Sequence, residues 1–155
     1  MAAFEFLELA EADAEAHALF ARAFRREAPY FPRHFVARFG ERAVGYVHYS
    51  EPTPDVYLCG GLCVDERVYR AMNESERSVV KRHGTLSRWL LEESIRQLVG
   101  KHAVFAYTGN AISLRDCLAL GFLPTDHKYL IVQWHAQPME DRAGLVARVA
   151  RYGPF

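Results

Sequence analysis

The chain has 155 residues, and its 19 Lys and Arg residues balance 19 Asp and Glu residues, so its formal net charge at pH 7 is zero when its seven histidines are neutral. Half of the residues are hydrophobic and a quarter are charged, which is a globular balance and excludes a disordered chain. A chain without net positive charge is not expected to be a general nucleic-acid binder. The length predicts one domain over residues 1–155.

Membrane and secretion signals are also missing from the sequence. No apolar run approaches the roughly 20 residues that span a bilayer, and the acidic, interrupted segment 1–15 does not resemble a signal peptide. Three cysteines, Cys59, Cys63 and Cys117, form an odd number and favour reduced thiols in a cytoplasmic protein. Cys59 and Cys63 lie four apart on an expected strand, hence on one face but about 13 Å apart, too far for a disulfide or a shared metal. The sequence predicts no metal site.

The first half of the chain predicts one helix among four strands. Alternating residues from Phe4 to Leu9 predict a short strand, and apolar residues at helical spacing predict a helix over 12–26 that Pro29 ends. Three strands follow, over 34–39, 42–49 and 56–64, with a tight turn at Gly40-Glu41 and a loop over 51–55. The last of these strands contains Gly60-Gly61, a pair typical of a β-bulge or a close backbone approach.

The second half alternates helices and strands. In chain order we expect a short helix near Glu74 capped by Asn73 with Glu76 as its partner, a helix over 85–98, a strand over 103–107, a helix over 113–120, a strand over 128–134 and a tail helix over 140–152 that carries Leu145, Val146 and Val149 on one side. The order β-α-β-β-β-α-β-α-β with a helical tail predicts an α/β fold, with a mixed sheet covered by helices.

One stretch carries a family resemblance. Residues 110–122 read Asn-Ala-Ile-Ser-Leu-Arg-Asp-Cys-Leu-Ala-Leu-Gly-Phe. They resemble the signature of the GNAT superfamily, the acyl-CoA-dependent N-acyltransferases, which has Asn, a small residue, Tyr and then Gly-Phe at this spacing. Asn110, Ser113 and Gly121-Phe122 match, whereas Cys117 stands where the Tyr usually is. The element order also resembles that of the family over about 4–134, and the helical extension 136–155 is left unexplained.

The resemblance implies acetyl-CoA, or another acyl-CoA, as cofactor, with Asn110 and Ser113 helping to hold it. The family receives the CoA pyrophosphate on a loop of the form Arg/Gln-x-x-Gly-x-Gly/Ala at a helix N-terminus, where backbone N–H groups are free. This chain has Thr and Ser at the two glycine positions, and their hydroxyls could donate to phosphate. The expected loop residues are Arg82, His83, Gly84, Thr85, Leu86 and Ser87, with Lys81 adding positive charge.

Two features of this region stay open. Gly84 could instead be a helix break and Thr85 an N-cap, with the basic residues merely solvated, although the match at 110–122 favours the phosphate loop. Segment 65–81, which typical members lack, reads as a short helix that either narrows the acceptor pocket or caps the sheet edge.

The strand over 57–64 has a role in the family as well. Members carry a bulge there that parts this strand from the next, and the resemblance implies that backbone N–H groups of Leu62, Cys63 and Val64 bind the pantetheine amides. An N–H near Leu62 would then polarise the thioester carbonyl as an oxyanion site. The alternative is a core strand whose glycines make room for a neighbouring side chain.

The sequence offers several acid and base candidates. The acceptor amine must lose a proton, and His48, Glu51, Tyr57, Asp65 and Glu66 are the candidate bases. Cys117 could replace the family's Tyr as the acid that protonates the leaving thiolate; the alternatives are a buried small hydrophobe at this position, with the proton coming from Tyr107, Tyr129 or solvent. The resemblance implies an acceptor pocket that contains Tyr30, Phe31 and Tyr46, with Phe35 and His48 nearby; the alternative is that these aromatic residues form a packed corner.

Three hypotheses follow. The first is an enzyme that moves an acetyl or other acyl group from CoA to an amine of a small molecule or peptide by direct attack. The second is a catalytically weak or inactive GNAT-fold module that binds CoA or a metabolite as a sensor or interaction protein. The third, compatible with either, is a homodimer built through the tail helix.

Overall fold

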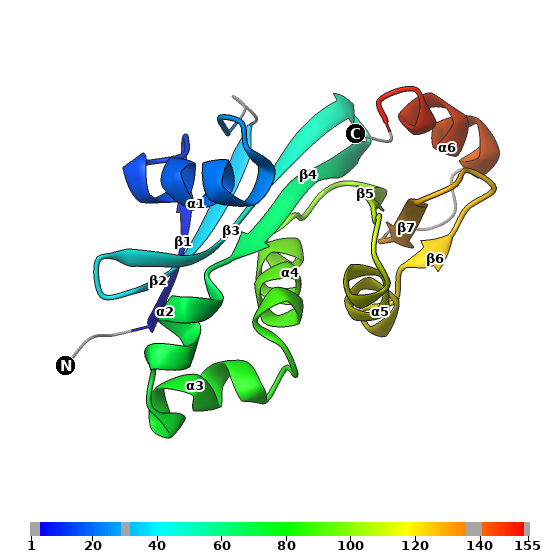
Figure 1. Ribbon diagram of the computed structural model, residues 1–155. Helices are drawn as coiled ribbons and strands as arrows, with labels where there is room; N and C mark the ends of the chain where they lie inside the picture. The colour runs from blue at the N-terminus through cyan, green and yellow to red at the C-terminus, as the bar shows by residue number, and fades with distance from the viewer. Residues whose placement is uncertain (1–3, 29–31, 136–140, 154–155) are drawn as a thin grey trace.

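A computed structural model describes residues 4–28, 32–135 and 141–153 and shows one sheet with helices on both faces (Figure 1). The elements are β1 (Phe4–Leu9), α1 (Ala14–Phe24), β2 (Arg33–Phe39), β3 (Arg42–Thr53), β4 (Val56–Val64), α2 (Glu66–Ala71), α3 (Glu74–Lys81), α4 (Leu86–Gln97), β5 (Ala103–Tyr107), α5 (Ala111–Ala119), β6 (Leu123–Pro124), β7 (Leu130–Trp134) and α6 (Arg142–Ala150). The seven strands lie in the order β1-β2-β3-β4-β5-β7-β6. Within the described residues only β4 and β5 pair in parallel, which confirms the predicted α/β fold with a mixed sheet.

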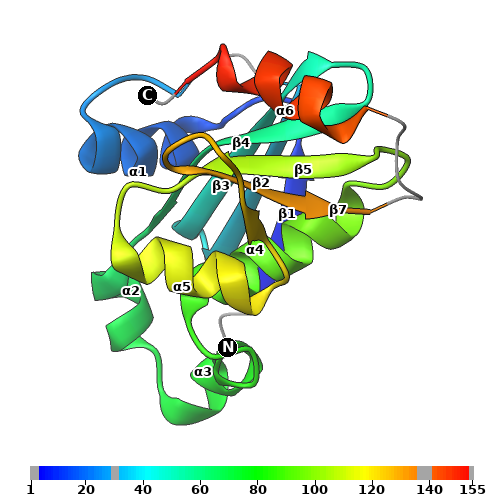
Figure 2. The same cartoon turned by 90° about the vertical axis from the view of Figure 1, so that its right-hand side faces the viewer.

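Helices cover the two faces of the sheet unequally. Helices α1 and α6 lie on one face, α4 and α5 lie on the other, and α2 and α3 extend beyond the sheet (Figure 2). The tail helix α6 buries Leu145 and Val149 completely against β4, β5 and β7, with Val146 partly buried beside them, as its apolar side predicts. Among the described residues no helix is both long and apolar enough to cross a membrane.

Three local predictions need correction. Strand β3 continues through Pro52 to Thr53, because the ladder between Ser50 and Thr53 is irregular and an irregular position tolerates a proline. Strand β6 was not predicted, since two exposed residues carry no periodic signal. Segment 65–81 holds two helices rather than one, each with its own N-cap: Asp65 begins α2, and Asn73 begins α3 with the predicted capping box.

A bulge in β4 has the largest consequence for the site. His48 pairs with Gly61 and Tyr49 pairs with Cys59, so Gly60 is the extra residue. The extra residue inverts the alternation of side chains along β4. Cys59 therefore packs in the core on the α4–α5 face, while Cys63 packs under α1. The expectation that both cysteines share a face is wrong for this reason.

Candidate functional site

Strands β4 and β5 part beyond the bulge and leave a slot between them. Their parallel pairing covers Val56–Cys59 and Ala103–Ala106, and within the described residues β4 has no β5 partner from Gly60 to Val64. We call the opening between residues 60–64 of β4 and the C-terminal end of β5 the slot. Asp65 N–H donates to the Val44 carbonyl of β3 at 2.7 Å. In an antiparallel ladder every second residue points its N–H toward the same neighbour, so the N–H of Cys63 also faces β3. The N–H groups of Leu62 and Val64 therefore point the other way, into the slot.

The N-terminus of α4 supplies a second row of N–H groups. Thr85 is its N-cap: the hydroxyl accepts from Arg88 N–H at 3.0 Å and donates to Asp116 Oδ2 at 3.1 Å. Both roles of the Thr85 hydroxyl are therefore filled within the protein. The N–H groups of Leu86 and Ser87, the first two helical residues, have no intrahelical acceptor and suit an anion.

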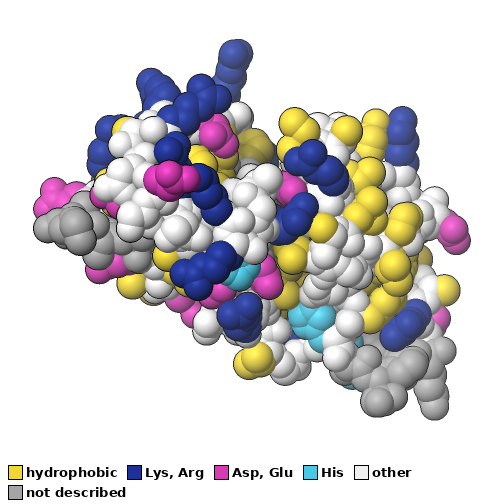
Figure 3. Space-filling model, turned by 90° about the horizontal axis from the view of Figure 1, so that it is seen from below, with side chains coloured by type: hydrophobic (Ala, Val, Ile, Leu, Met, Phe, Trp, Pro, Cys, Tyr) yellow, Lys and Arg dark blue, Asp and Glu magenta, His cyan; other side chains and the backbone are white. Residues whose placement is uncertain are grey.

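The basic residues before this helix contribute less charge than the sequence predicts. Lys81 is paired with Glu74 at 3.2 Å, and His83 Nδ1 lies 2.6 Å from Glu92 on the outer side of α4. Within the described residues Arg82 is exposed and has no ion pair. In a view from below, Lys and Arg side chains are most numerous at the upper left of the face, and a few lie near its middle (Figure 3).

The Asn110–Phe122 match has a clear local structural role. Asn110 is the N-cap of α5, and its Oδ1 accepts from Ser113 N–H at 2.8 Å. Gly121 follows the end of the same helix at a φ of 90°, where a side chain would be strained, and Phe122 is buried in the core. These residues fix where α5 begins and ends, and contact of Asn110 and Ser113 with a cofactor stays a prediction.

Cys117 is poorly placed for proton transfer. Its side chain is 3% exposed in the core on the α4–α5 face, and burial raises the pKa of its thiol to about 12, with further raising by electrostatic interaction with Cys59 and Asp116. Loss of its proton would leave a poorly solvated thiolate, which favours the alternative of a small buried hydrophobe. Of the alternative proton donors, the Tyr107 hydroxyl donates a hydrogen bond to the Ala150 carbonyl at 3.2 Å. Tyr129 is 41% exposed and therefore accessible from solvent.

The position of Tyr129 is notable for its backbone. Its carbonyl accepts from Thr108 N–H at 2.9 Å, just after β5, so it lies near the end of the slot. It holds a φ of 69°, which is uncommon for a bulky residue.

We expect the three thiols to resist modification in the folded protein. Burial raises the pKa of Cys59 to about 11 and the pKa of Cys63 and Cys117 to about 12, so the reactive thiolate is scarce at pH 8. Labelling by an aromatic disulfide reagent should be at least about 100-fold slower in the native than in the urea-unfolded chain. Stopped-flow absorbance measures both rates. Fast native labelling that disappears in Cys117→Ala would show instead that Cys117 is an accessible, active thiol.

The candidate bases are dispersed. The Tyr57 hydroxyl accepts from Arg33 at 3.0 Å, and Tyr57 precedes Leu62 by five residues, or about 16 Å along β4. Glu51 is paired with Lys101 at 3.3 Å, and Glu66 is exposed in the first turn of α2. Asp65 caps α2: burial acts to raise the pKa of its carboxyl, but hydrogen bonds from Val68 and Arg67 N–H and nearby guanidinium charges outweigh burial and lower the pKa.

His48 is the candidate base that lies at the bulge. It pairs with Gly61 across β3 and β4, is fully buried and packs against Phe20 of α1 at 5.2 Å between ring centroids. Burial lowers its pKa to about 3, helped by the positive charges of His34 and Arg26, so His48 is neutral at pH 7.

The structure describes part of the predicted acceptor pocket. Tyr46 is fully buried behind His48, and its hydroxyl lies 2.5 Å from His34 Nδ1, so Tyr46 supports the wall instead of lining an open pocket. Phe35 is also fully buried, on the opposite face of the sheet. Tyr30 and Phe31 lie outside the described residues.

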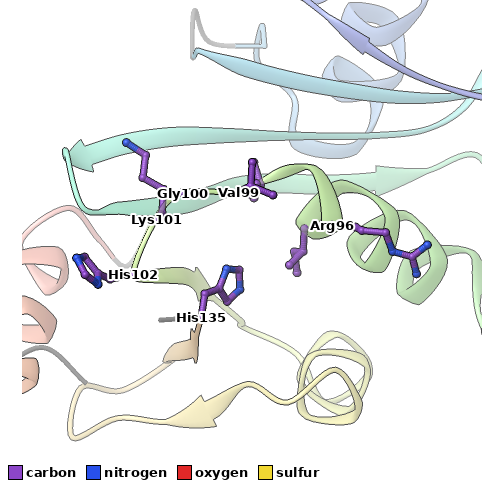
Figure 4. Close-up of a pocket in the computed structure, with 8 residues that line it drawn as sticks. Arg96, Val99, Gly100, Lys101, His102 and His135 are labelled. Atoms are coloured by element: carbon purple, nitrogen blue, oxygen red, sulfur yellow. The ribbon is translucent and has the colours of Figure 1, made fainter. Parts of the chain in front are cut away.

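A cavity of about 520 Å³ lies away from the slot, between the end of α4 and the start of β5. Figure 4 shows that its polar side chains do not converge: Arg96 and His102 point to opposite sides. The cavity brings together none of the predicted site residues. Within the described ranges, no group of three or more His, Cys, Asp or Glu side chains could hold a metal ion.

Comparison with known proteins identifies the fold. No family model and no curated protein sequence matches the chain. Solved structures do match: the ribosomal-protein-S18-alanine N-acetyltransferase of Escherichia coli (15% identity, 88% of this chain and 98% of that chain, TM-score 0.58), the N-acetyltransferase PseH of Campylobacter jejuni (12%, 86% and 99%, 0.56) and a GNAT family acetyltransferase of Brucella melitensis in complex with acetyl-CoA (15%, 87% and 91%, 0.51). The chain therefore has the fold of the GNAT N-acetyltransferases, as the resemblance implied.

Proposed function

We propose that this chain is an N-acyltransferase that moves an acetyl or other acyl group from CoA to the amine of a small molecule or peptide. The observation that carries the proposal is the slot: β4 and β5 separate after a bulge at Gly60, and the N–H groups of Leu62 and Val64 face the opening. The unpaired N–H groups at the start of α4 fit the phosphates of the same ligand. The acetyl-CoA complex of the Brucella melitensis acetyltransferase, which shares the fold, supports this choice of ligand.

The residues divide the work as follows. Leu86 and Ser87 N–H would hold the pyrophosphate, with Arg82 at the loop, and Val64 N–H would bond the pantetheine arm. Bound acyl-CoA supplies a thioester as the activated acyl group. Leu62 N–H would stabilise the negative charge that develops on the carbonyl oxygen when the amine nitrogen attacks and the carbon–sulfur bond breaks. The nitrogen loses one proton and the leaving thiolate gains one.

His48 limits which amines can react. A neutral imidazole with a pKa of about 3 is a weak base, so it would deprotonate an ordinary alkyl ammonium poorly. We therefore propose acceptors that are already largely unprotonated at the working pH. Cys117 is too buried to be the favoured acid, and Tyr129 or solvent at the end of the slot would protonate the thiolate.

A second candidate function is a module that binds CoA without transfer. Two observations favour it: Cys117 is buried where the family has its acid, and the carboxylate of Asp116 lies beside the N-terminus of α4. Neither observation affects the slot, so both candidates share the ligand and differ in turnover.

Acetyl-CoA binding tests both candidates. At 100 times its Kd, acetyl-CoA is expected to stabilise the fold by about 2.7 kcal/mol, which raises the unfolding midpoint by about 5–10 °C in a chain of this size. The absence of a shift at millimolar acetyl-CoA would contradict both functions. If a shift is seen, thiol release with a panel of alkyl and aryl amines separates transfer from binding alone.

A further inference from the structure

An ion pair between a half-buried arginine and a buried carboxylate joins the start of α4 to α5. Arg88 lies in the first turn of α4, and Asp116, one residue before Cys117, is 1% exposed on the inner side of α5. A terminal nitrogen of the Arg88 guanidinium is 3.5 Å from Asp116 Oδ1, while Thr85 donates to Asp116 Oδ2 at 3.1 Å. Neither Arg88 nor Asp116 belongs to the site predicted from the sequence.

The guanidinium lies at the end of the helix where a cation is least favourable. The Arg88 side chain folds back over Gly84, so closely that a Cβ added to Gly84 would be 3.1 Å from a terminal guanidinium nitrogen. An arginine in this turn adds its charge to the positive end of the helix dipole, which favours anions. The first turn of α4 contains no acidic residue, and Asp116 compensates from the neighbouring helix.

The hydrogen bonding of this pair is incomplete. Arg88 Nε and Asp116 Oδ1 are both buried, and neither has a hydrogen-bond partner among the described residues. The unpaired N–H groups of Leu86 and Ser87 start the same helix. The region thus holds several donors and a positive potential, and a ligand with several negative oxygens would satisfy them better than one carboxylate does.

We propose that Arg88 binds the pyrophosphate of the acyl donor and that Asp116 competes with the phosphate for the guanidinium. In the free protein Asp116 holds Arg88 at the N-terminus of α4. When the donor binds, the phosphate oxygens accept hydrogen bonds from the Arg88 guanidinium and from the N–H groups of Leu86 and Ser87. Thr85 keeps its hydrogen bond to Asp116. The inference rests on the proposed function, and it makes this pair the determinant of preference for donors that carry a diphosphate.

Affinities for two donors test the inference. Isothermal titration measures the Kd of acetyl-CoA and of S-acetyl-pantetheine, which has the same thioester and arm without phosphates. Arg88→Ala should weaken acetyl-CoA about 10- to 100-fold and leave S-acetyl-pantetheine unchanged, because one charged hydrogen-bonding group is lost. Arg88→Lys keeps the charge but loses the planar guanidinium that can donate two parallel hydrogen bonds, so its affinity for acetyl-CoA should be intermediate. Asp116→Asn, which can still accept from Thr85, should bind acetyl-CoA about threefold or more tightly.

Controls separate this outcome from loss of structure. Arg96→Ala removes an arginine from the same helix, far from its N-terminus and paired with Glu92 and Glu93, and should change neither affinity. Thermal unfolding establishes that each variant is folded. Equal weakening of both donors by Arg88→Ala, or weaker acetyl-CoA binding by Asp116→Asn, would overturn the inference while the proposed function stands. Failure of the unaltered chain to bind either donor would overturn both.

Discussion

Replacing Ser87 with glutamate is expected to stabilise the fold slightly and to weaken acetyl-CoA binding about 100-fold. Ser87 is the second residue of α4, its side chain is only partly buried, and no acidic residue occupies the first turn. A carboxylate there complements the helix dipole by about 0.3–1 kcal/mol, and glutamate has the higher helix propensity. The same carboxylate would lie within about 5 Å of a bound phosphate, where two negative charges repel by about 3 kcal/mol at an effective dielectric constant of 20.

The opposite signs make this variant informative. Thermal unfolding without ligand measures the stability change, and isothermal titration with acetyl-CoA measures the affinity. Ser87→Gln is the matched control, because it has the size of glutamate without the charge and should retain most of the affinity. Undiminished acetyl-CoA binding by Ser87→Glu would show that the phosphates do not bind at the start of α4, and the cofactor site would have to be placed elsewhere.

The fold was predictable where local signals agree with tertiary packing. Strands 56–64 and 103–107 have the bounds that were predicted, because each is a run of mostly apolar residues bounded by turn residues. The capping box at Asn73 and Glu76 also formed as predicted. The side-chain alternation of β4 was not predictable, because inserting Gly60 changes the face of every following residue and the sequence does not say which glycine bulges.

The candidate site was less accessible to prediction. Leu62, Cys63 and Val64 were named in advance only through the family resemblance, and the register was needed to show that the N–H of Cys63 faces β3 while those of Leu62 and Val64 face the slot. Arg88 and Asp116 are 28 residues apart, and only the packing of α4 on α5 brings them together. One signal was present in the sequence: Asp116 is a charged residue beside the buried Cys117 on a short helix, and such residues are rarely buried without a partner.

The pairing of His83 with Glu92 also could not be predicted from the sequence. His83 follows Lys81 and Arg82 in a basic run, which suggests a phosphate site, yet its ring bonds Glu92 nine residues later. Charge runs in a sequence give the number of charges, whereas the field at a site depends on which of them are already paired. The start of α4 therefore owes its positive potential to backbone N–H groups, Arg82 and Arg88 more than to the run as a whole.

Gly61→Val is expected to lower the free energy of unfolding by about 3 kcal/mol and to weaken acetyl-CoA binding as well. Gly61 has a φ of 153°, and a Cβ there would lie 3.2 Å from Phe20 and 3.4 Å from Phe24, so a branched side chain adds crowding against α1 to backbone strain. Relief of the crowding would shift β4 at the bulge and move Leu62 N–H in the slot. Urea unfolding and acetyl-CoA titration measure the two effects.

Two alanine variants separate strain from crowding. Gly100 has a φ of 83° with no atom within 4 Å of an added Cβ, so Gly100→Ala reports backbone strain alone, about 1 kcal/mol, and should leave acetyl-CoA affinity unchanged. Gly61→Ala should cost more than Gly100→Ala, because the Phe20 ring must move by a few tenths of an ångström. If Gly61→Val were as stable as Gly100→Ala, α1 would not press on the bulge. If Gly61→Val were unstable but bound acetyl-CoA normally once folded, the slot geometry would not depend on this glycine. The contact with Phe20 would then position α1 and not the N–H groups of β4.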